Sequence, residues 1–220
     1  WNRYRSGLIA RLCRAETSPG TELLEVGCGR GGEVAQLRRA GLAATGVELA
    51  PVTPVDAAAA YVLGGQDANT LPAAERARVR CILLFDVLEH LPEPADFLRR
   101  LQSSFENLEV VIVTVPARAE LWSNYDDFYG HFRRYTPAML EALGQSLGWR
   151  TQRTAYFFKL LYLPMRLMSA LGVSRGTAVK PPRTGTRGLH HLVASLHRLE
   201  EWLLPGSVPG TSAYAVYRVD

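Results

Sequence analysis

The stretch Leu-Leu-Glu-Val-Gly-Cys-Gly-Arg-Gly-Gly at residues 23–32 decides the predicted fold. An apolar run precedes the glycines and a helix-like segment follows them, which predicts a strand at 22–26, a tight loop and a helix at 32–40. Glycines in such a loop let the backbone come close to a ligand, because no Cβ stands in the way. The stretch therefore predicts a ligand-binding turn at the end of a buried strand.

An acidic residue, Glu48, ends the next apolar run at 43–48. In nucleotide-binding folds, an acid about 20 residues beyond the glycine loop accepts hydrogen bonds from ribose hydroxyls. Gly27, Gly29 and Gly32 also fit the dinucleotide fingerprint GxGxxG. This spacing alone leaves open a nicotinamide-dependent oxidoreductase and a glycine turn without any ligand.

Two further motifs favour a different cofactor. Glu25 and the glycines form Glu-x-Gly-x-Gly-x-Gly, which resembles the first motif of class I S-adenosylmethionine-dependent methyltransferases. The run Asp-Val-Leu-Glu-His-Leu at 86–91 resembles the motif after the fourth strand in the small-molecule branch of that family. The resemblance implies S-adenosylmethionine as cofactor and S-adenosylhomocysteine as product, and it disfavours the oxidoreductase.

The resemblance also implies a cofactor site spread over the first 90 residues. Glu48 with Leu49 would hold the ribose, Asp67 with the small Ala68 the adenine, and Arg5 the methionine carboxylate. Asp67 could instead form only a turn, and Arg5 could lie on the surface. The residues implied for the cofactor are Arg5, Glu25, Gly27, Gly29, Glu48, Leu49, Asp67, Ala68 and Asp86.

A long segment at 121–137 combines aromatic residues, two acids, a histidine and two arginines. Loops of this length inside a compact domain are usually functional. The segment resembles the Gly-His-x-Arg-Arg-Tyr-Thr motif of one branch of these methyltransferases, which implies one wall of the substrate pocket. The residues expected to contact the substrate are His90, Trp122, Tyr129, Arg133 and Arg134.

Within this segment His131 is the candidate general base, because an imidazole titrates near neutral pH. The alternative is that His131 pairs with Asp126 and shapes the loop. Arg133 and Arg134 could bind an anionic substrate group bidentately or cap the edge of the neighbouring strand.

The resemblance and the hydrophobic periodicity together predict one α/β domain over residues 1–220. Its Rossmann-like sheet is mostly parallel, has seven strands and flanking helices, and ends in an antiparallel strand. We expect a leading helix in 1–18, a cofactor-binding core in 19–156, a helical lid or insertion in 157–205 and the final strand in 206–220. Strands are expected at 22–26, 43–48, 61–63, 79–85, 110–115, 149–156 and 212–219.

Charge is distributed unevenly along the chain. Residues 142–199 contain nine arginines and lysines and no acid. The span indicates an anionic partner, such as an anionic or lipid-like substrate or a membrane surface reached by 157–172, or simply a solvated basic face. Basic residues alone provide no stacking platforms, so nucleic acid is not expected.

The remaining composition indicates a cytoplasmic protein without a metal. The three cysteines are widely spaced and are expected to be reduced thiols. The first residues form no secretory signal, and the sequence does not begin with Met, which indicates trimming. His190, His191 and His197 lie in the acid-free span without cysteine, so no metal site is expected there.

Overall fold

The computed structural model describes residues 2–174, 176 and 187–219. Its centre is a seven-stranded sheet in the order β3-β2-β1-β4-β5-β7-β6. The strands are β1 (Glu22–Val26), β2 (Ala43–Glu48), β3 (Val62–Gly64), β4 (Val79–Phe85), β5 (Val110–Pro116), β6 (Arg150–Phe157) and β7 (Ser212–Arg218). β7 pairs antiparallel with β5 and β6, and the other neighbouring strands pair in parallel. The predicted sheet and its antiparallel last strand are confirmed.

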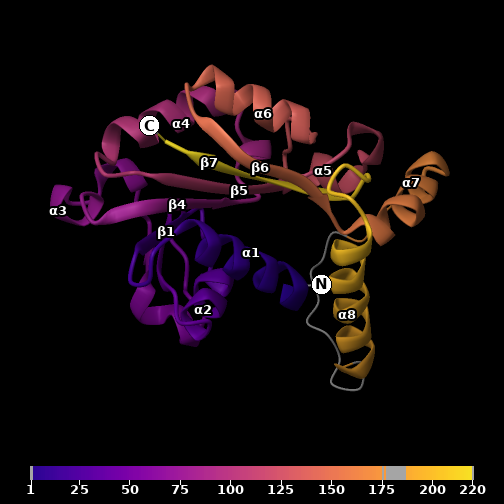
Figure 1. Cartoon of the computed structure of the whole chain (residues 1–220), viewed down its shortest axis with the longest axis horizontal. Helices are drawn as coiled ribbons and strands as arrows, with labels where there is room; N and C mark the ends of the chain where they lie inside the picture. The colour runs from indigo at the N-terminus through magenta and orange to yellow at the C-terminus, as the bar shows by residue number, and fades with distance from the viewer. Residues whose placement is uncertain (1, 175, 177–186, 220) are drawn as a thin grey trace.

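Helices cover both faces of the sheet (Figure 1). α1 and α2 lie on one face, and α4 and α6 lie on the other. The helices are α1 (Asn2–Glu16), α2 (Gly32–Arg39), α3 (Ala73–Arg76), α4 (Pro94–Ser104), α5 (Asn124–Phe128), α6 (Pro137–Ser146), α7 (Tyr162–Ala170) and α8 (Arg187–Leu203).

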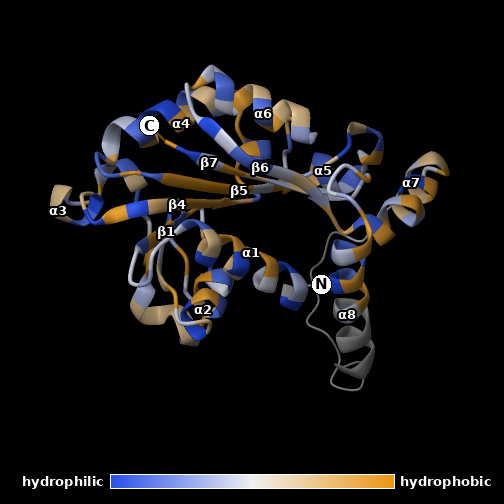
Figure 2. Ribbon diagram, in the orientation of Figure 1, coloured by the Kyte–Doolittle hydropathy of each residue, from blue (hydrophilic) through white to orange (hydrophobic). Residues whose placement is uncertain are grey.

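The central strands are apolar along their length because both of their faces are covered (Figure 2). Along β4, Ile82 and Leu84 belong to the core cluster that contains Leu98 of α4 and Leu140 of α6. The alternate residues of β4 belong to the cluster formed with α1 and α2. Successive side chains of a strand point to opposite faces, so a buried parallel strand contributes to both cores.

Local sequence signals account for several helix ends. Thr136 Oγ1 accepts a hydrogen bond from the Met139 amide at 3.2 Å, and Pro137 occupies the first turn of α6. Gly41, with φ 80°, follows the end of α2. The boundaries of α2 agree with the predicted helix at 32–40 within one residue.

Some elements differ from the prediction. Residues 56–61 form a 3-10 helix, and the third strand begins one residue later than expected. The short helices α3 and α5 were not predicted. α5 begins with a capping box between Ser123 and Asp126. Both residues belong to the 121–137 segment, so this sign of a helix start was present in the sequence.

The segment before the last strand is helical, as expected. α7 contains Pro164 in its first turn, where the missing amide hydrogen is not needed. α8 lies against α1 at the open end of the sheet, where Arg11 forms an ion pair with Glu201 (Figure 1). Within the predicted insertion at 157–205, residues 175 and 177–186 fall outside the described residues. Among the helices described, none has the length and apolar character to span a bilayer.

We predict that Gly144→Ala destabilises the fold, because α6 packs tightly on β7 at this glycine. A Cβ at Gly144 would lie 2.7 Å from the Tyr217 ring. Overpacking of this kind should lower the free energy of unfolding by about 1–3 kcal/mol in urea denaturation followed by circular dichroism. Gly7→Ala in α1 is the matched control, because its new Cβ would have no contact closer than 3.8 Å. Equal stability of the two variants would contradict this account of the α6 packing.

Candidate active site

The glycine loop between β1 and α2 is packed at two positions and open at a third. Gly27, Gly29 and Gly31 all have positive φ, at 78°, 52° and 76°. A Cβ at Gly27 would meet Val87 at 2.8 Å, and one at Gly31 would meet Val62 at 2.4 Å. At Gly29 a Cβ would meet nothing within 4 Å. The loop therefore needs glycine for its conformation and leaves free space beside Gly29.

Glu48 connects this loop to the end of β2. Its Oε2 accepts a hydrogen bond from the Gly29 amide at 2.8 Å, and its Oε1 accepts one from the Ala50 amide at 3.1 Å. The carboxylate thus lies directly beside the glycine turn, where a ribose was expected.

A first cavity of about 570 Å³ opens next to Glu48. It lies at the carboxyl ends of β1, β2 and β4, where open α/β sheets bind ligands. Six of the nine residues implied for the cofactor line it: Gly27, Glu48, Leu49, Asp67, Ala68 and Asp86. Asp67 also forms the alternative turn, because its Oδ1 accepts from the Asn69 amide at 2.9 Å.

The other polar cofactor residues meet behind the loop. Arg5 Nη1 lies 2.6 Å from Asp86 Oδ2, and Arg5 Nη2 donates to Thr114 at 3.0 Å. Glu25 is buried, and its Oε2 has no hydrogen-bond partner among the described residues. Burial and the nearby Glu33 raise the pKa of Glu25 well above its usual value. The acidic side chains of Glu25 and Asp86 can bind a cationic substituent of a ligand, and the guanidinium of Arg5 can bind an anionic one.

A second cavity, also of about 570 Å³, adjoins the first. The two cavities share Asp86 and His90 in their linings. The second is closed by aromatic and apolar side chains from α5, the end of β6 and α7, including Tyr129, Phe158 and Met165. Two ligands bound in these cavities would therefore meet at the end of β4.

One wall of the second cavity is fixed by the buried carboxylate of Asp126. Arg134 donates to both of its oxygens, at 2.8 and 3.0 Å, and His131 Nδ1 lies 2.8 Å from Oδ1. The Ser123 amide adds a bond of 2.9 Å. Burial acts to raise the pKa of Asp126, but the hydrogen bonds and charge of Arg134 outweigh it and hold this pKa below its usual value. His131 therefore pairs with Asp126 and keeps Nε2 for the cavity.

The arginines and Trp122 form hydrogen bonds within the protein, and the bond from Arg134 to Ala117 directly after β5 agrees with the predicted alternative of capping that strand edge. Arg134 lines the second cavity, but its bidentate bonds go to Asp126 and its Nη1 donates to the Ala117 carbonyl. Arg133 donates to the Pro92 carbonyl, and the Trp122 indole donates to Asp127. Neither Arg133 nor Trp122 lines the two cavities. Three of the five residues expected to contact the substrate therefore line the second cavity: His90, Tyr129 and Arg134. The guanidinium of Arg134 is bound to Asp126.

Glu89 is the site residue that the sequence analysis missed. It is 1% exposed, and its Oε2 has no partner among the described residues. Burial and the neighbouring Asp86 raise the pKa of Glu89 to about 9. The signal was present in the Glu-His pair of the 86–91 motif, because Glu89 and His90 follow a central strand together.

Glu89, His90 and His131 converge in the second cavity. Their potential metal-ligand atoms all lie within 4.8 Å of one another, and the rings of His90 and His131 meet edge to face at 4.8 Å. The sequence predicted a protein without a metal, on the ground that His190, His191 and His197 lack further ligands, and this cluster contains none of those three histidines. Of those, His197 pairs with Glu200 at 3.0 Å where α8 packs on the end of β6.

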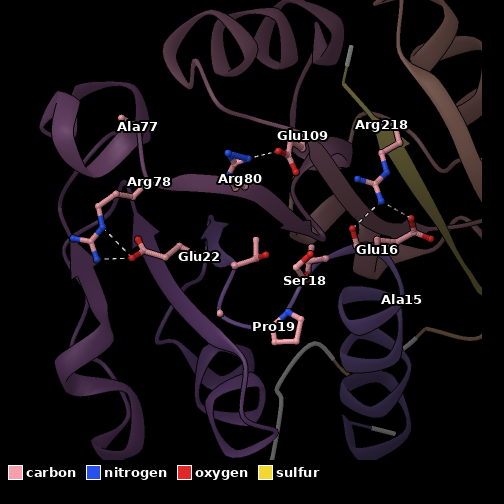
Figure 3. A pocket seen from close by; sticks show the side chains of 13 residues that line it. Ala15, Glu16, Ser18, Pro19, Glu22, Ala77, Arg78, Arg80, Glu109 and Arg218 are labelled. Carbon is pink, nitrogen blue, oxygen red and sulfur yellow. Dashed lines mark hydrogen bonds and ion pairs between the residues drawn. The ribbon is translucent and has the colours of Figure 1, made fainter.

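A larger hollow of about 750 Å³ lies at the opposite, amino-terminal ends of the strands (Figure 3). Its charged side chains pair with one another, in Arg78–Glu22, Arg80–Glu109 and Arg218–Glu16. These charges are already balanced, and the hollow is distant from the glycine loop. The two cavities at the carboxyl ends are therefore the candidate active site.

Solved structures share this fold at low sequence identity. A SAM-dependent methyltransferase from Archaeoglobus fulgidus is 15% identical, with 99% of this chain and 96% of that one covered and a TM-score of 0.56. Magnesium protoporphyrin IX methyltransferase from Synechocystis PCC 6803 is 13% identical, with 100% and 80% covered and a TM-score of 0.54. Phosphoethanolamine N-methyltransferase 2 from Haemonchus contortus is 15% identical, with 99% and 52% covered and a TM-score of 0.56.

Comparisons of the sequence itself give one match, to a family of methyltransferase domains. A search among curated proteins finds no match. The model of a methyltransferase domain family matches residues 1–154, which include the glycine loop, the end of β4 and the 121–137 segment. The chain therefore belongs to the methyltransferase domain family, and its resemblance to class I S-adenosylmethionine-dependent methyltransferases is confirmed.

Proposed function

We propose that this protein transfers a methyl group from S-adenosylmethionine to an oxygen or nitrogen of a small-molecule acceptor. The observation that carries the proposal is the pair of adjoining cavities that share Asp86 and His90. The first cavity has the glycine turn and the carboxylate suited to a nucleoside, and the second has an aromatic wall suited to an acceptor. The reacting sulfur and the acceptor atom would meet at the shared residues.

Polar groups in the first cavity and directly beside it match the parts of the cofactor; Arg5 itself lines the second cavity. Glu48 would accept from the ribose hydroxyls and Asp67 from the adenine amino group. Buried Glu25 would face the methionine ammonium, and Arg5 would pair with the methionine carboxylate in exchange for part of its contact with Asp86. These residues thus offer acidic groups to the donor groups of the cofactor and a guanidinium to its one carboxylate.

The reaction is an in-line displacement at the methyl carbon. The leaving S-adenosylhomocysteine is neutral, so alignment and exclusion of water supply much of the acceleration. A protonated acceptor also needs a base, and we assign this role to Nε2 of His131. The Asp126 carboxylate at Nδ1 would stabilise the imidazolium that forms.

Calorimetric titration tests the cofactor part of this proposal. The protein should bind S-adenosylmethionine and S-adenosylhomocysteine and show no comparable binding of nicotinamide dinucleotides. Tight nicotinamide binding without S-adenosylmethionine binding would instead support an oxidoreductase. Failure to bind any of these cofactors would support the alternative of a basic membrane- or RNA-associated module with a vestigial pocket.

We predict that Glu48→Ala weakens S-adenosylhomocysteine binding by about 1–3 kcal/mol, as expected for the loss of hydrogen bonds to a charged group. The effect has two sources, because Glu48 also holds the Gly29 amide at 2.8 Å. Calorimetry on the folded variant measures it. Glu106→Ala, at an exposed acid beyond α4, is the matched control and should bind as the unmodified protein does. An unchanged affinity in Glu48→Ala would refute the ribose assignment.

The surface of α7 favours a lipid-like acceptor or contact with an anionic membrane. Leu163, Leu167 and Leu171 are four residues apart and are 73%, 61% and 69% exposed. They form one outward apolar stripe on a helix that also contributes Met165 to the acceptor cavity. The stripe lies in the acid-free, basic part of the chain. Apolar and basic residues together are typical of helices that lie in a membrane interface.

We predict that the unmodified protein floats with vesicles containing anionic phosphatidylserine at low salt. The double variant Leu163→Glu with Leu167→Glu should weaken this partition by about tenfold or more, because two apolar side chains that would enter the bilayer are replaced by charged ones. Higher salt should also release the protein, since surface attraction is screened. Met139→Glu, at a 42% exposed residue of α6, is the control and should bind vesicles normally. Absence of binding at low salt would exclude the membrane contact and leave the methyltransferase proposal in place.

A further inference from the structure

We propose that Glu89, His90 and His131 bind a divalent first-row transition-metal ion, such as Mn²⁺, Fe²⁺ or Zn²⁺, in the acceptor cavity. The ion would hold the acceptor through an oxygen atom beside the shared residues Asp86 and His90. Its binding to the protein stands on the side-chain geometry alone, whereas its contact with an acceptor rests on the proposed methyltransferase function.

The three side chains have the composition and spacing of a metal site. Two imidazoles and one carboxylate form a set that suits non-haem iron and related divalent ions and leaves coordination positions open. Ligands held at about 2.1 Å from one ion lie roughly 3–3.5 Å apart in tetrahedral or facial octahedral geometry. The ligand atoms here lie within 4.8 Å of one another. Small side-chain rotations that move the ligand atoms by about 1 Å would bring them to these distances.

The buried Oε2 of Glu89 is an independent indication of a missing cation. This atom has no hydrogen-bond partner among the described residues, although the side chain is 1% exposed. Buried polar atoms in native proteins almost always have a partner, so an orphaned carboxylate oxygen needs an explanation. A metal ion between Glu89 and the two histidines would supply the partner and favour the ionised carboxylate.

The surroundings of the histidines also match those of metal ligands. His131 Nδ1 lies 2.8 Å from Asp126, which Arg134 holds in turn through both carboxylate oxygens. A carboxylate behind a ligating histidine fixes the ring and its tautomer and leaves Nε2 for the metal. The ring of His90 is hydrogen-bonded to the backbone of Tyr129. Both rings are thus oriented by their neighbours before any ion binds.

The position of the ion would change how the acceptor is activated. With three protein ligands, an acceptor hydroxyl can fill an open position and lose its proton to the solvent at a lowered pKa. A lone pair of this oxygen then forms the bond to the methyl carbon. The electrons of the S–CH₃ bond pass to sulfur, and neutral S-adenosylhomocysteine leaves. In this state His131 serves as a ligand, and the separate base of the metal-free protein is not needed.

Metal binding can be measured before any acceptor is known. Protein without a polyhistidine tag is treated with chelator, dialysed and titrated with Mn²⁺, and the free ion is followed by its electron paramagnetic resonance signal. We expect one saturable site per chain and a rise in melting temperature on loading, because the ion binds only the folded state. Zn²⁺ should displace Mn²⁺ from the same site.

Single variants separate this site from adventitious binding. Glu89→Gln, His90→Ala and His131→Ala should each weaken Mn²⁺ binding by tenfold or more and remove the metal-dependent rise in melting temperature. Glu93→Gln, at an exposed acid four residues beyond Glu89, is the matched control and should bind Mn²⁺ normally. Circular dichroism and urea denaturation identify variants that are folded. Glu89→Gln keeps the size of the side chain, so it remains informative if a histidine variant unfolds.

The outcomes distinguish the metal site from the methyltransferase function. Absence of saturable Mn²⁺ binding, or binding that all three variants retain, would overturn the proposed metal site. S-adenosylhomocysteine binding without metal binding would overturn the metal site alone. Metal binding that depends on these three residues would support the site even in a protein that failed to bind the cofactor.

Discussion

The buried carboxylate of Asp126 is the constraint on which the acceptor side of the site depends. It receives two bonds from Arg134, one from the Ser123 amide and a contact from His131, all within 3.0 Å. A buried ion pair costs desolvation energy, and removal of one partner typically costs about 3–5 kcal/mol because a charge is left unpaired. Asp126 thereby fixes the start of α5, the position of His131 and the inner end of the 121–137 segment together.

The sequence was sufficient for the fold and for bringing together the residues that line the first cavity, because both depend on local patterns. Apolar runs located all seven strands, and the glycines with Glu48 located the first cavity, since strand ends and turns bring these residues together directly. The acceptor side depends on contacts between distant residues. Nothing local indicated that both carboxylate oxygens of Asp126 would bind Arg134, or that His131 would come close to Glu89 and His90.

The segment between β6 and β7 shows why the substrate is harder to infer than the cofactor. Phe158 and Met165 enter the second cavity from this segment, next to Tyr129 of the 121–137 loop. Neither contributes a charged group, so the acceptor would be recognised there by shape and apolar contact rather than by a motif. The same α7 helix exposes Leu163, Leu167 and Leu171 on its outer side. A substrate drawn from an apolar phase would therefore meet exposed leucines on the same helix that contributes Met165 to the cavity.

Charge balance connects the two cavities to the chemistry of methyl transfer. The sulfonium loses its positive charge during the reaction, so strongly negative surroundings would stabilise the bound cofactor more than the transition state and slow the step. The site limits this effect: Asp86 pairs with Arg5, and burial together with the neighbouring Asp86 raises the pKa of Glu89 to about 9. A divalent ion bound to ionised Glu89 and to an acceptor anion would preserve the same balance, because its two positive charges meet two negative ones. The near-neutral lining is thus compatible with the metal-free and the metal-bound forms of the proposed reaction.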